Sequence, residues 1–575
     1  MDRKHAGHGE RSGHDGCAGR AVVPGRQIKQ WTLGLPLGGL LMAGSAWAFE
    51  PVTFDNGAVL DVSTQISYTY MKRLQGVDPA LVDVSSPLAI NGDDGNRTVG
   101  KHGTISNRLG ALVDVDLRQH EYRAFMRLSS VYDAALDRGN VNTSQATFNA
   151  PSASDQFIPA ARDLVGSRTR LLDAYVQGRW KLADDSRYPL TLRAGRQVVA
   201  WGEGLHFMGI SGAMNPVEGY KAQIPGTPIK EMFLPTELVS ATLGLGSRLM
   251  LMGYGKWTFR ESEMMPVNTY FSFNDLVGPG ASYMRFGSGV PLGAWRAPDM
   301  GRKVGGQWGV GAKYQITEAT DIGLYALRYN ALLGLPEFRY GGDFWMLGQG
   351  AAALPMLANF APASFSFRYM DDIKLTGASF STKLGEFNVA GEVAHRSGAP
   401  VLMADSHYQL ARARVTNAQL SAIRLWGPEF LQGLLGVDTV QASAELATSS
   451  VHGFDTPAYS GTPMAPAQLK FDKNTMAYAV GLTLKYTGVF PGWDVAVPID
   501  WMHQWRGNPA LQGWNSGLQG ENDRRLGLGL NFIYQQNLEL GVKLAHYLGK
   551  PDWRDHSFRT LTDRDFIAIT ASDRF

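Results

Sequence analysis

The chain has 575 residues and a nearly balanced charge, with 54 basic and 52 acidic side chains, which excludes a role built on attraction to nucleic acid or another polyanion. No run of about eighteen apolar residues occurs, so no segment is suited to a transmembrane helix. A chain of this kind enters a membrane only as a closed barrel, because no water is available there for unpaired backbone groups.

The one continuous apolar segment lies near the N-terminus, at residues 31–42, and follows Arg26 and Lys29. Basic residues, a short apolar core and the small residues of Ala46-Trp47-Ala48 are typical of a secretory signal peptide. The segment is too short for a membrane anchor. We therefore expect residues 1–48 to be a signal peptide.

Cleavage is expected between Ala48 and Phe49, which leaves residues 49–575 as a single barrel domain. The polar stretch before the apolar segment is longer than the start of an ordinary leader, and translation from Val22 or Val23 would explain that length. The only cysteine of the chain lies in the discarded part, which excludes disulfides, cysteine-bound zinc and thiol catalysis in the mature protein.

Segments of about ten residues with alternating apolar and polar side chains recur along the rest of the chain. In one of them, Val480, Leu482 and Leu484 share a face, while Gly481 and Thr483 share the other. An aliphatic face suits contact with lipid, and the opposite face suits a polar lumen. We predict an all-β fold, a transmembrane antiparallel β-barrel of eighteen strands, with sixteen as the alternative count. The strands begin near Leu60, Leu109, Tyr122, Leu171, Leu190, Leu238, Leu249, Trp308, Ile322, Ile373, Phe387, Ala418, Val440, Tyr478, Val495, Leu526, Leu538 and Phe566.

Short and long joints alternate between the predicted strands. The short joints include Gln119-His120-Glu121, Gly246-Ser247, Gly385 and Gln535-Gln536, with a small helix expected at residues 427–435. The long joints include residues 73–105, 134–168, 201–236, 261–303 and 331–370. Short periplasmic turns, long extracellular loops and an even number of strands are typical of outer-membrane barrels. We therefore expect a protein of the outer membrane of a Gram-negative bacterium.

Two of the long loops, residues 201–236 and 331–370, are rich in methionine, aromatic residues and proline. Exposed loops are usually polar, so this composition predicts extracellular loops that partly plug the lumen, by folding inward or against each other. Flexible Met and aromatic surfaces also suit apolar ligands of varied shape. An apolar core between packed loops, with no ligand, explains the same composition equally well.

Four residues of the first of these loops are candidate plug residues. Trp201 and Glu203 follow the strand that begins near Leu190, so we expect both at the lumen wall. Lys230 and Glu231 interrupt an otherwise apolar run, and if they turn inward each needs the other or a lumen charge as its partner. We consider this pair as a polar latch, or as groups that orient the head group of a solute.

The inward strand faces are expected to carry both signs of charge. Asp114 and Asp116 lie on one strand, and the candidate lumen residues Arg123 and Arg127 lie on the next. Pairs such as Asp116 with Arg123 can neutralise each other across the lumen wall, and we favour this interpretation. The alternative is a selectivity ring built from one sign of charge.

Several blocks of residues resemble one known family. The blocks are residues 193–203, 215–217, 225–231, 269–275, 377–381 and 388–392. On these blocks the chain resembles the domain-of-unknown-function family numbered 1302, over essentially the whole mature region. The resemblance implies a Gram-negative outer-membrane protein and the trafficking of hydrophobic compounds. It transfers no catalytic residue.

The chain ends in an alternating segment, residues 565–575, whose last residue is Phe575. A final strand with a terminal aromatic residue resembles the signal by which the barrel assembly machinery recognises outer-membrane proteins. Asp573 departs from that signal, because the position is usually apolar. The alternative, a secreted soluble β-protein, would need one strand face to cover a second sheet.

We predict an outer-membrane channel for passive or gated uptake of hydrophobic small molecules. A general porin is the first alternative, followed by a membrane-embedded lipid hydrolase and a surface scaffold. His395 with Ser397, and His206 with Ser211, lack a third catalytic partner at diagnostic spacing. We therefore expect no enzymatic activity, no cofactor and no metal site. The expected partners are outer-membrane lipid, the barrel assembly machinery and a periplasmic protein, without nucleic acid.

Overall fold

The computed structural model describes residues 50–182, 188–227, 229–290, 292–301, 303–341, 343–346, 350–353, 356, 361–404, 409–430, 432–455, 458–459, 462–463, 468–553 and 559–575. The predicted leader, with its cleavage point between Ala48 and Phe49, lies outside the described residues. Among the helices in the described part of the chain, none is long and apolar enough to cross a membrane.

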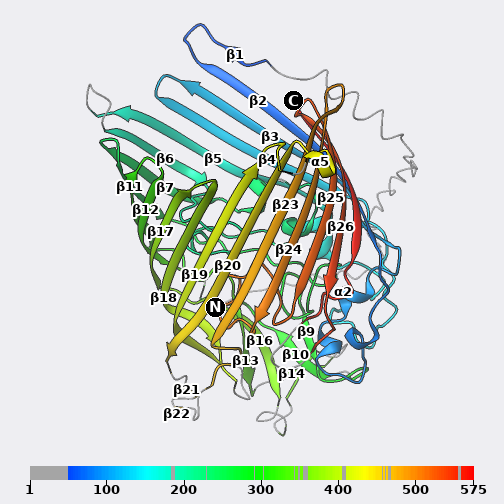
Figure 1. The fold of residues 1–575 in the computed structure, drawn as a ribbon. Helices are drawn as coiled ribbons and strands as arrows, with labels where there is room; N and C mark the ends of the chain where they lie inside the picture. The colour runs from blue at the N-terminus through cyan, green and yellow to red at the C-terminus, as the bar shows by residue number, and fades with distance from the viewer. Residues whose placement is uncertain are drawn as a thin grey trace, which may run out of the picture. The chain divides into compact units, whose positions relative to one another are not determined.

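The main sheet has 19 strands, and all of them except the short β1 (Val52–Thr53) form a closed antiparallel ring (Figure 1). Each ring strand pairs with the next in chain order, and β27 pairs back with β2, where Tyr70 faces Ile569 across the seam. The predicted eighteen-stranded barrel is confirmed, and each predicted segment falls in a different strand. The ring strands are β2 (Val59–Arg73), β3 (Thr104–Gln119), β4 (Tyr122–Asp133), β5 (Ser167–Lys181), β6 (Pro189–Gln197), β7 (Thr236–Leu245), β8 (Leu249–Lys256), β11 (Gln307–Thr317), β12 (Thr320–Tyr329), β17 (Ile373–Leu384), β18 (Phe387–Leu402), β19 (Leu410–Trp426), β20 (Thr439–Phe454), β23 (Asn474–Phe490), β24 (Trp493–Arg506), β25 (Arg524–Tyr534), β26 (Leu538–Leu548) and β27 (Phe566–Arg574).

The joints alternate in length as predicted, except that the joint 403–409 at the long-loop end is shorter than the joint 427–438 at the other end. At one end of the barrel, called the short-turn end, the strands are joined by residues 120–121, 182–188, 246–248, 318–319, 385–386, 427–438, 491–492 and 535–537. The joint 427–438 contains α5 (Gln432–Leu435), the small helix expected there. At the other end, called the long-loop end, the joints are 74–103, 134–166, 198–235, 257–306, 330–372, 403–409, 455–473, 507–523 and 549–565.

The outer face of the barrel is apolar, and the inner face packs against loops. On β12, Ile322 and Leu324 are 37% and 61% exposed, whereas Tyr325 and Leu327, which point the other way, are buried. Val480 on β23 is likewise exposed. Side chains alternate between the two faces of a strand, so these rows give the barrel the apolar surface that a bilayer would cover.

A second sheet of six strands lies at the long-loop end (Figure 1). It joins two long loops, because β10 of the loop 257–306 pairs with β14 and β16 of the loop 330–372. Ala294, Phe365 and Phe367 belong to its buried core. The strands are β9 (Tyr283–Arg285), β10 (Leu292–Arg296), β13 (Leu335–Tyr340), β14 (Asp343–Met346), β15 (Gly350–Ala353) and β16 (Pro362–Arg368).

Residues 331–370 were expected to fold into the lumen or against residues 201–236, and the structure corrects this for most of the described residues. Strands β14 and β16 pair with β10 of the loop 257–306. Ala331 and Met370, near the two ends of the loop, share a buried cluster with Trp201 and Ile210. Backbone groups removed from water need hydrogen-bond partners, and pairing with β10 supplies them.

Short elements complete the described part of the chain. They are β21 (Ala458–Tyr459), β22 (Thr462–Pro463), η2 (Pro79–Leu81), η3 (Ala89–Asn91), α2 (Asp94–Arg97), α3 (Pro159–Ala161), η4 (Arg162–Gly166), η5 (Ser211–Ala213), η6 (Lys221–Gln223) and α4 (Ile229–Met232). All of them lie in the long loops, and three of them, η5, η6 and α4, lie in the loop 198–235, which enters the barrel.

Candidate functional site: the lumen and its inward loop

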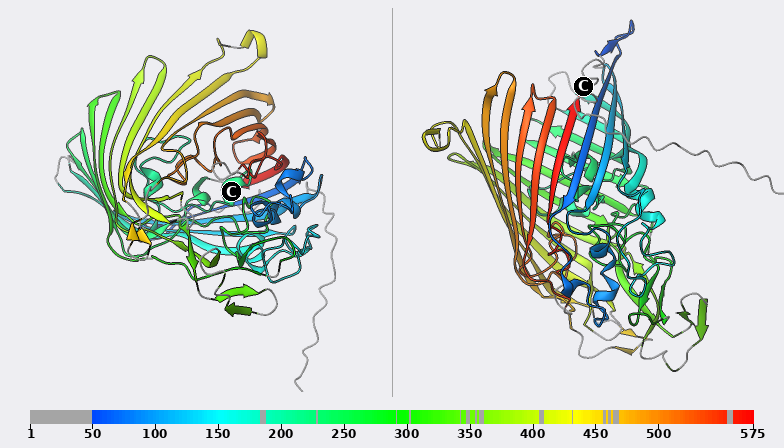
Figure 2. Two further views of the ribbon diagram at one scale, coloured as in Figure 1. Left: turned by 90° about the horizontal axis from the view of Figure 1, so that it is seen from below. Right: turned by 90° about the vertical axis from the view of Figure 1, so that its right-hand side faces the viewer.

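The loop between β6 and β7, residues 198–235, is called the inward loop. It lies within the ring of strands (Figure 2, left). Residues 201–210 contact side chains of β8, β11, β12, β18, β19 and β20. Residues 221–231 contact β2, β3, β4 and β27 on the opposite side of the ring. The inward loop therefore spans the lumen from wall to wall.

Two buried glutamates of the barrel wall hold the first half of the inward loop by its main chain. Glu392 on β18 accepts the N–H groups of Glu203 and Ile210, both at 2.7 Å. Glu445 on β20 accepts the N–H groups of three successive residues, 205–207. Hydrogen bonds to a charged acceptor contribute about 1.5–3 kcal/mol each. The two carboxylates are therefore the principal polar attachment of this half of the loop.

Glycines allow the inward loop to approach these glutamates. A Cβ atom at Gly209 would lie 1.5 Å from Oε1 of Glu392, and one at Gly202 would lie 2.2 Å from Oε2 of the same residue. Gly202 also has a φ of 97°, a conformation that glycine adopts without steric cost. Only a backbone without side chains at these positions fits against the carboxylate.

Trp201 and Glu203 anchor the loop to the neighbouring wall. The indole of Trp201 is buried and packs on Tyr254 of β8 and Tyr325 of β12, with ring centroids 5.2 Å and 6.0 Å away. The carboxylate of Glu203 pairs with Lys313 of β11 at 2.7 Å. Both candidate residues therefore lie against the lumen wall, several strands beyond the end of β6.

Lys230 and Glu231 occupy the far side of the lumen, and each has its own partner. Lys230 pairs with Asp114 of β3 at 3.3 Å. Glu231 accepts a hydrogen bond from Ser129 of β4 at 2.6 Å and pairs with Lys221 of the inward loop at 3.1 Å. The latch candidates are thus bound to lumen groups and to the loop itself, not to each other.

A network of charges connects the inward loop to the loop 257–306. Arg170 of β5 pairs with Glu218 of the inward loop at 2.6 Å and also with Glu263. Arg168 pairs with Glu263 at 2.6 Å. Burial raises the pKa of Glu263, but the two arginines outweigh burial and hold that pKa below its ordinary value. The network secures both loops to β5.

A second segment, residues 507–523, fills the lumen beside the inward loop. The N–H of Met208 donates to the carbonyl oxygen of Trp514 at 3.0 Å. The ring of Phe207 packs on that of Trp514, with centroids 6.1 Å apart. Phe207 and Trp514 share a buried cluster with Ala477 of β23. Two loops therefore occupy the interior at this level.

A cavity of about 420 Å³ lies on the lumen wall toward the short-turn end. Arg123 pairs with Asp116 at 2.7 Å, and Arg127 pairs with Asp114 at 2.7 Å, so these candidate residues meet acids of the adjacent strand. The lining is Asp61, Ser63, Asp114, Asp116, Arg118, Arg123, Phe125, Arg127, Asp173, Tyr175, Arg193 and Arg574. Both signs of charge are mixed within it, as mutual neutralisation requires.

The role of Glu392, which lies on the inward face of β18, could not be predicted from the sequence. The sequence around an inward-facing acidic residue is the same whether its carboxylate pairs with an arginine of the next strand or accepts a main-chain N–H of a loop. The nearby glycines, Gly202, Gly204 and Gly209, were the signal that a backbone approaches closely there. A Cβ atom at Gly204 would lie 2.4 Å from Gln419 of β19, which itself donates to Glu392.

The histidines considered for catalysis make other contacts. His395 shares the outer strand face with the exposed Val393, and its Nδ1 lies 3.0 Å from Oγ1 of Thr416. The Nε2 atom of His206 lies 3.3 Å from Oγ of Ser443, on the barrel wall. Neither contact involves the serine that sequence spacing had suggested.

Comparisons with solved structures give distant likenesses. OccAB2 of Acinetobacter baumannii is 11% identical, with 91% of this chain and 99% of that chain covered and a TM-score of 0.40. OccAB4 of the same organism is 10% identical, with 91% and 99% covered and a TM-score of 0.41. OccK3 (OpdO) of Pseudomonas aeruginosa is 10% identical, with 90% and 95% covered and a TM-score of 0.38. Among curated proteins, none matches the chain.

The family comparison covers nearly the whole chain. The family described as "Protein of unknown function (DUF1302)" matches residues 31–575. The match begins within the predicted leader and continues to the final strand. It confirms the resemblance found in the sequence blocks at 193–203 and beyond. The chain belongs to the DUF1302 family.

Proposed function

We propose that this protein is an outer-membrane channel that the inward loop holds closed. The observation that carries the proposal is the attachment of one loop to opposite walls, through Glu392 and Glu445 on one side and Asp114 and Ser129 on the other. The closed ring and its apolar outer face support residence in a bilayer. A barrel this wide has room for an aqueous path once such a loop is displaced.

The lining of the lumen favours small polar or charged solutes. The apolar side chains that suggested a hydrophobic solute are used in packing, since Trp201, Phe207, Ile210 and Met214 are all at most 8% exposed. The cavity toward the short-turn end is lined mainly by Asp and Arg. Uptake of hydrophobic molecules is the second candidate, and its support is the family resemblance and the Met and aromatic content of the loops.

Replacement of the inward loop by a short turn tests the closed state. Gln197 and Thr236 are direct partners at the ends of β6 and β7, so an Asn-Gly turn can join the strands in place of residues 198–235. In planar bilayers, the wild-type protein should conduct close to zero. The shortened protein should conduct as an open pore that residues 507–523 still narrow. The physical reason is the removal of the segment that spans the lumen.

A matched control removes a long loop that does not cross the lumen. Leu335 and Arg368 are partners in the six-stranded sheet, so an Asn-Gly turn can replace residues 336–367 between them. This variant should conduct like the wild type. A wild-type protein that conducts as a wide, unselective pore would contradict the proposal, as would a closed variant without residues 198–235.

The two solute classes are separated by uptake into vesicles. Liposomes that contain the shortened protein should swell in small sugars and amino acids if the path is aqueous. A deletion strain should be compared with wild type for growth on fatty acids, terpenoids, sterols and aromatic compounds. A growth defect confined to apolar compounds, without swelling in polar solutes, would favour the second candidate.

A further inference from the structure

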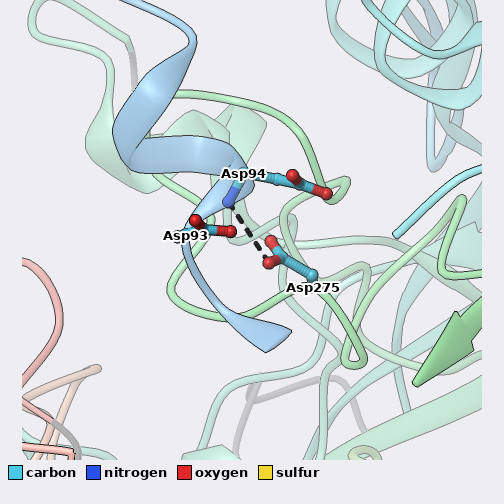
Figure 3. Close-up of side chains that lie close together, drawn as sticks. All are labelled: Asp93, Asp94 and Asp275. Atoms are coloured by element: carbon cyan, nitrogen blue, oxygen red, sulfur yellow. Dashed lines mark hydrogen bonds between the residues drawn. The ribbon is translucent and has the colours of Figure 1, made fainter. Parts of the chain in front are cut away.

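Three buried carboxylates from two long loops meet at the long-loop end. Asp93 and Asp94 lie at the start of α2, and Asp275 lies in the loop 257–306 (Figure 3). Each offers one oxygen within 4.8 Å of those of the other two. Their exposures are 0%, 1% and 0%. Two oxygens bound to one calcium ion lie at most about 5 Å apart, so the spacing suits a shared cation.

Several oxygens around this group have no hydrogen-bond donor among the described residues. Oδ2 of Asp275 accepts the N–H of Asp94 at 3.2 Å, but Oδ1 of Asp275 has no partner. Oδ1 of Asp93 is also without a partner. A buried acceptor that is left unpaired costs about 1–3 kcal/mol, and these are charged acceptors.

A neighbouring amide adds an independent observation. The side chain of Asn149 is 2% exposed and donates through Nδ2 to Asn91 at 2.7 Å and to the carbonyl of Tyr283 at 3.0 Å. These bonds set the orientation of the amide, so Oδ1 is an acceptor, and it has no donor among the described residues. The N–H of Asn149 donates to Asp94 at 3.1 Å, which places this residue beside the carboxylates.

The charge of the group is only partly balanced. Arg97 pairs with Asp93 through Oδ2 at 2.5 Å. Arg285 and the buried Arg564 donate their hydrogen bonds to main-chain carbonyls and not to these carboxylates. Each still attracts one carboxylate electrostatically, Arg285 that of Asp94 and Arg564 that of Asp275. Among the described residues, Arg97 is the one cation that forms an ion pair with a carboxylate of this group, so a bound metal ion would meet negative charge there.

We propose that Asp93, Asp94 and Asp275 bind a divalent cation, with calcium as the preferred ion. Carboxylate and amide oxygens are the ligands of hard cations, and calcium accepts an irregular set of six to eight of them. Magnesium demands a regular octahedron and keeps several waters, which suits this enclosed site poorly. Zinc prefers nitrogen and sulfur ligands in addition to oxygen, and the three residues supply only oxygen.

Calcium at this position would tie three long loops together. Asp93 and Asp94 belong to the loop 74–103, Asp275 to the loop 257–306, and Asn149 to the loop 134–166. Calcium sites of extracellular modules bind with dissociation constants of about 0.1–1 mM. A site in that range would be filled outside a cell and emptied by chelation. The sequence alone does not indicate this site, because Asp275 lies far along the chain from Asp93 and Asp94.

Terbium luminescence on the refolded full-length barrel tests the proposal. Trp553 packs against Gly92, because a Cβ atom there would lie 2.2 Å from its indole, so the indole can sensitise a lanthanide bound next to Asp93. Excitation of tryptophan should give saturable terbium emission that calcium displaces. Asp275→Asn should weaken terbium binding at least about tenfold, because a charged ligand is lost. The control Asp83→Asn changes an exposed acid of the same loop and should bind like the wild type.

Thermal unfolding gives a second measurement that does not depend on tryptophan. Calcium should raise the melting temperature of the wild type, and a chelator should lower it. The double variant Asp94→Asn/Asp275→Asn relieves the repulsion, so it should fold and melt at a temperature that calcium does not change. A folded wild type without saturable terbium emission and without a calcium-dependent melting temperature would overturn the site. Equal terbium affinity in Asp275→Asn would also overturn it.

Discussion

The carboxylate of Glu392 on β18 accepts the N–H of Ile210, in the inward loop, at 2.7 Å, and a side chain at the adjacent Gly209 would collide with the same carboxylate. This contact joins a barrel strand to a loop whose sequence position is nearly two hundred residues away. The carboxylates of Glu392 and Glu445 are therefore the groups that hold the first half of the inward loop against the barrel wall.

Neutralising the two wall glutamates should release the first half of the inward loop. Glu392→Gln with Glu445→Gln removes two negative acceptors from five main-chain N–H groups and so weakens charge-assisted bonds. We expect frequent open events in single-channel recordings, where the wild type stays closed. Glu386→Gln is a suitable control, because that glutamate lies at the short-turn end and is exposed. Identical closed recordings for the double variant and the wild type would contradict this role.

A single methyl group at Gly209 should have a similar effect. The added Cβ would lie 1.5 Å from Glu392 Oε1, so the loop must move away from the wall. Gly209→Ala should therefore increase protease cleavage within residues 198–235 and raise conductance. Gly255→Ala provides the control, because a Cβ atom there meets nothing within 4 Å. Equal protease resistance of both variants would show that the loop accommodates the methyl group.

The two faces of β23 should tolerate charge differently. Leu482 shares its face with the exposed Val480, whereas Thr483 shares its face with Gly481, whose added Cβ would approach Asp500 and His206. An arginine on the lipid face at mid-membrane costs about 2–4 kcal/mol. Leu482→Arg should thus reduce the folded fraction in lipid vesicles, and Thr483→Arg should be far milder. Equal losses, measured by the heat-dependent shift in gel mobility, would show that the assigned faces are wrong.

The terminal aromatic residue is predicted to act in assembly. The main chain of Phe575 exchanges two hydrogen bonds with Thr64 of β2, at 2.7 Å and 2.9 Å, and so extends the seam of the barrel. Deletion of Phe575 should lower the amount of folded barrel in the outer membrane, because it removes the predicted recognition signal for the assembly machinery. Asp573→Tyr should leave the amount unchanged or raise it. Normal assembly of the deletion variant would show that Phe575 is not an assembly signal.

Acid should weaken the attachment of the loops to β5. The pKa of Glu263 is held below its ordinary value, so its ionised form stabilises the fold above the pKa of the unfolded chain, near 4.3. That stability is lost as the pH falls from about 4.3 through the lower folded pKa. In the wild type, the loop 257–306 should therefore lose its protease resistance more steeply with falling pH in this range. Glu263→Gln should be less resistant at neutral pH and should show a flatter acid profile.

The number of strands and their faces could be predicted from the sequence, because both depend on local patterns. A lipid-facing row such as Ile322 and Leu324 repeats every second residue, and the strand geometry alone sends those side chains outward. A short turn, such as the one after Gln119, forces the two strands that it joins to pair with each other, as β3 and β4 do. The barrel therefore follows from segments that can be examined one at a time.

The positions and packing partners of the long loops were decided only by the tertiary structure. The composition of residues 201–236 and of 331–370 is similar, yet one loop crosses the lumen and the other pairs with β10 in a separate sheet. Glu392 and Ile210, and likewise Asp94 and Asp275, come together from distant positions. Hydrogen bonds and ion pairs require specific atoms within about 3–4 Å. No local pattern encodes such a distance, so these contacts exist only after barrel closure sets the positions of the strands and loops.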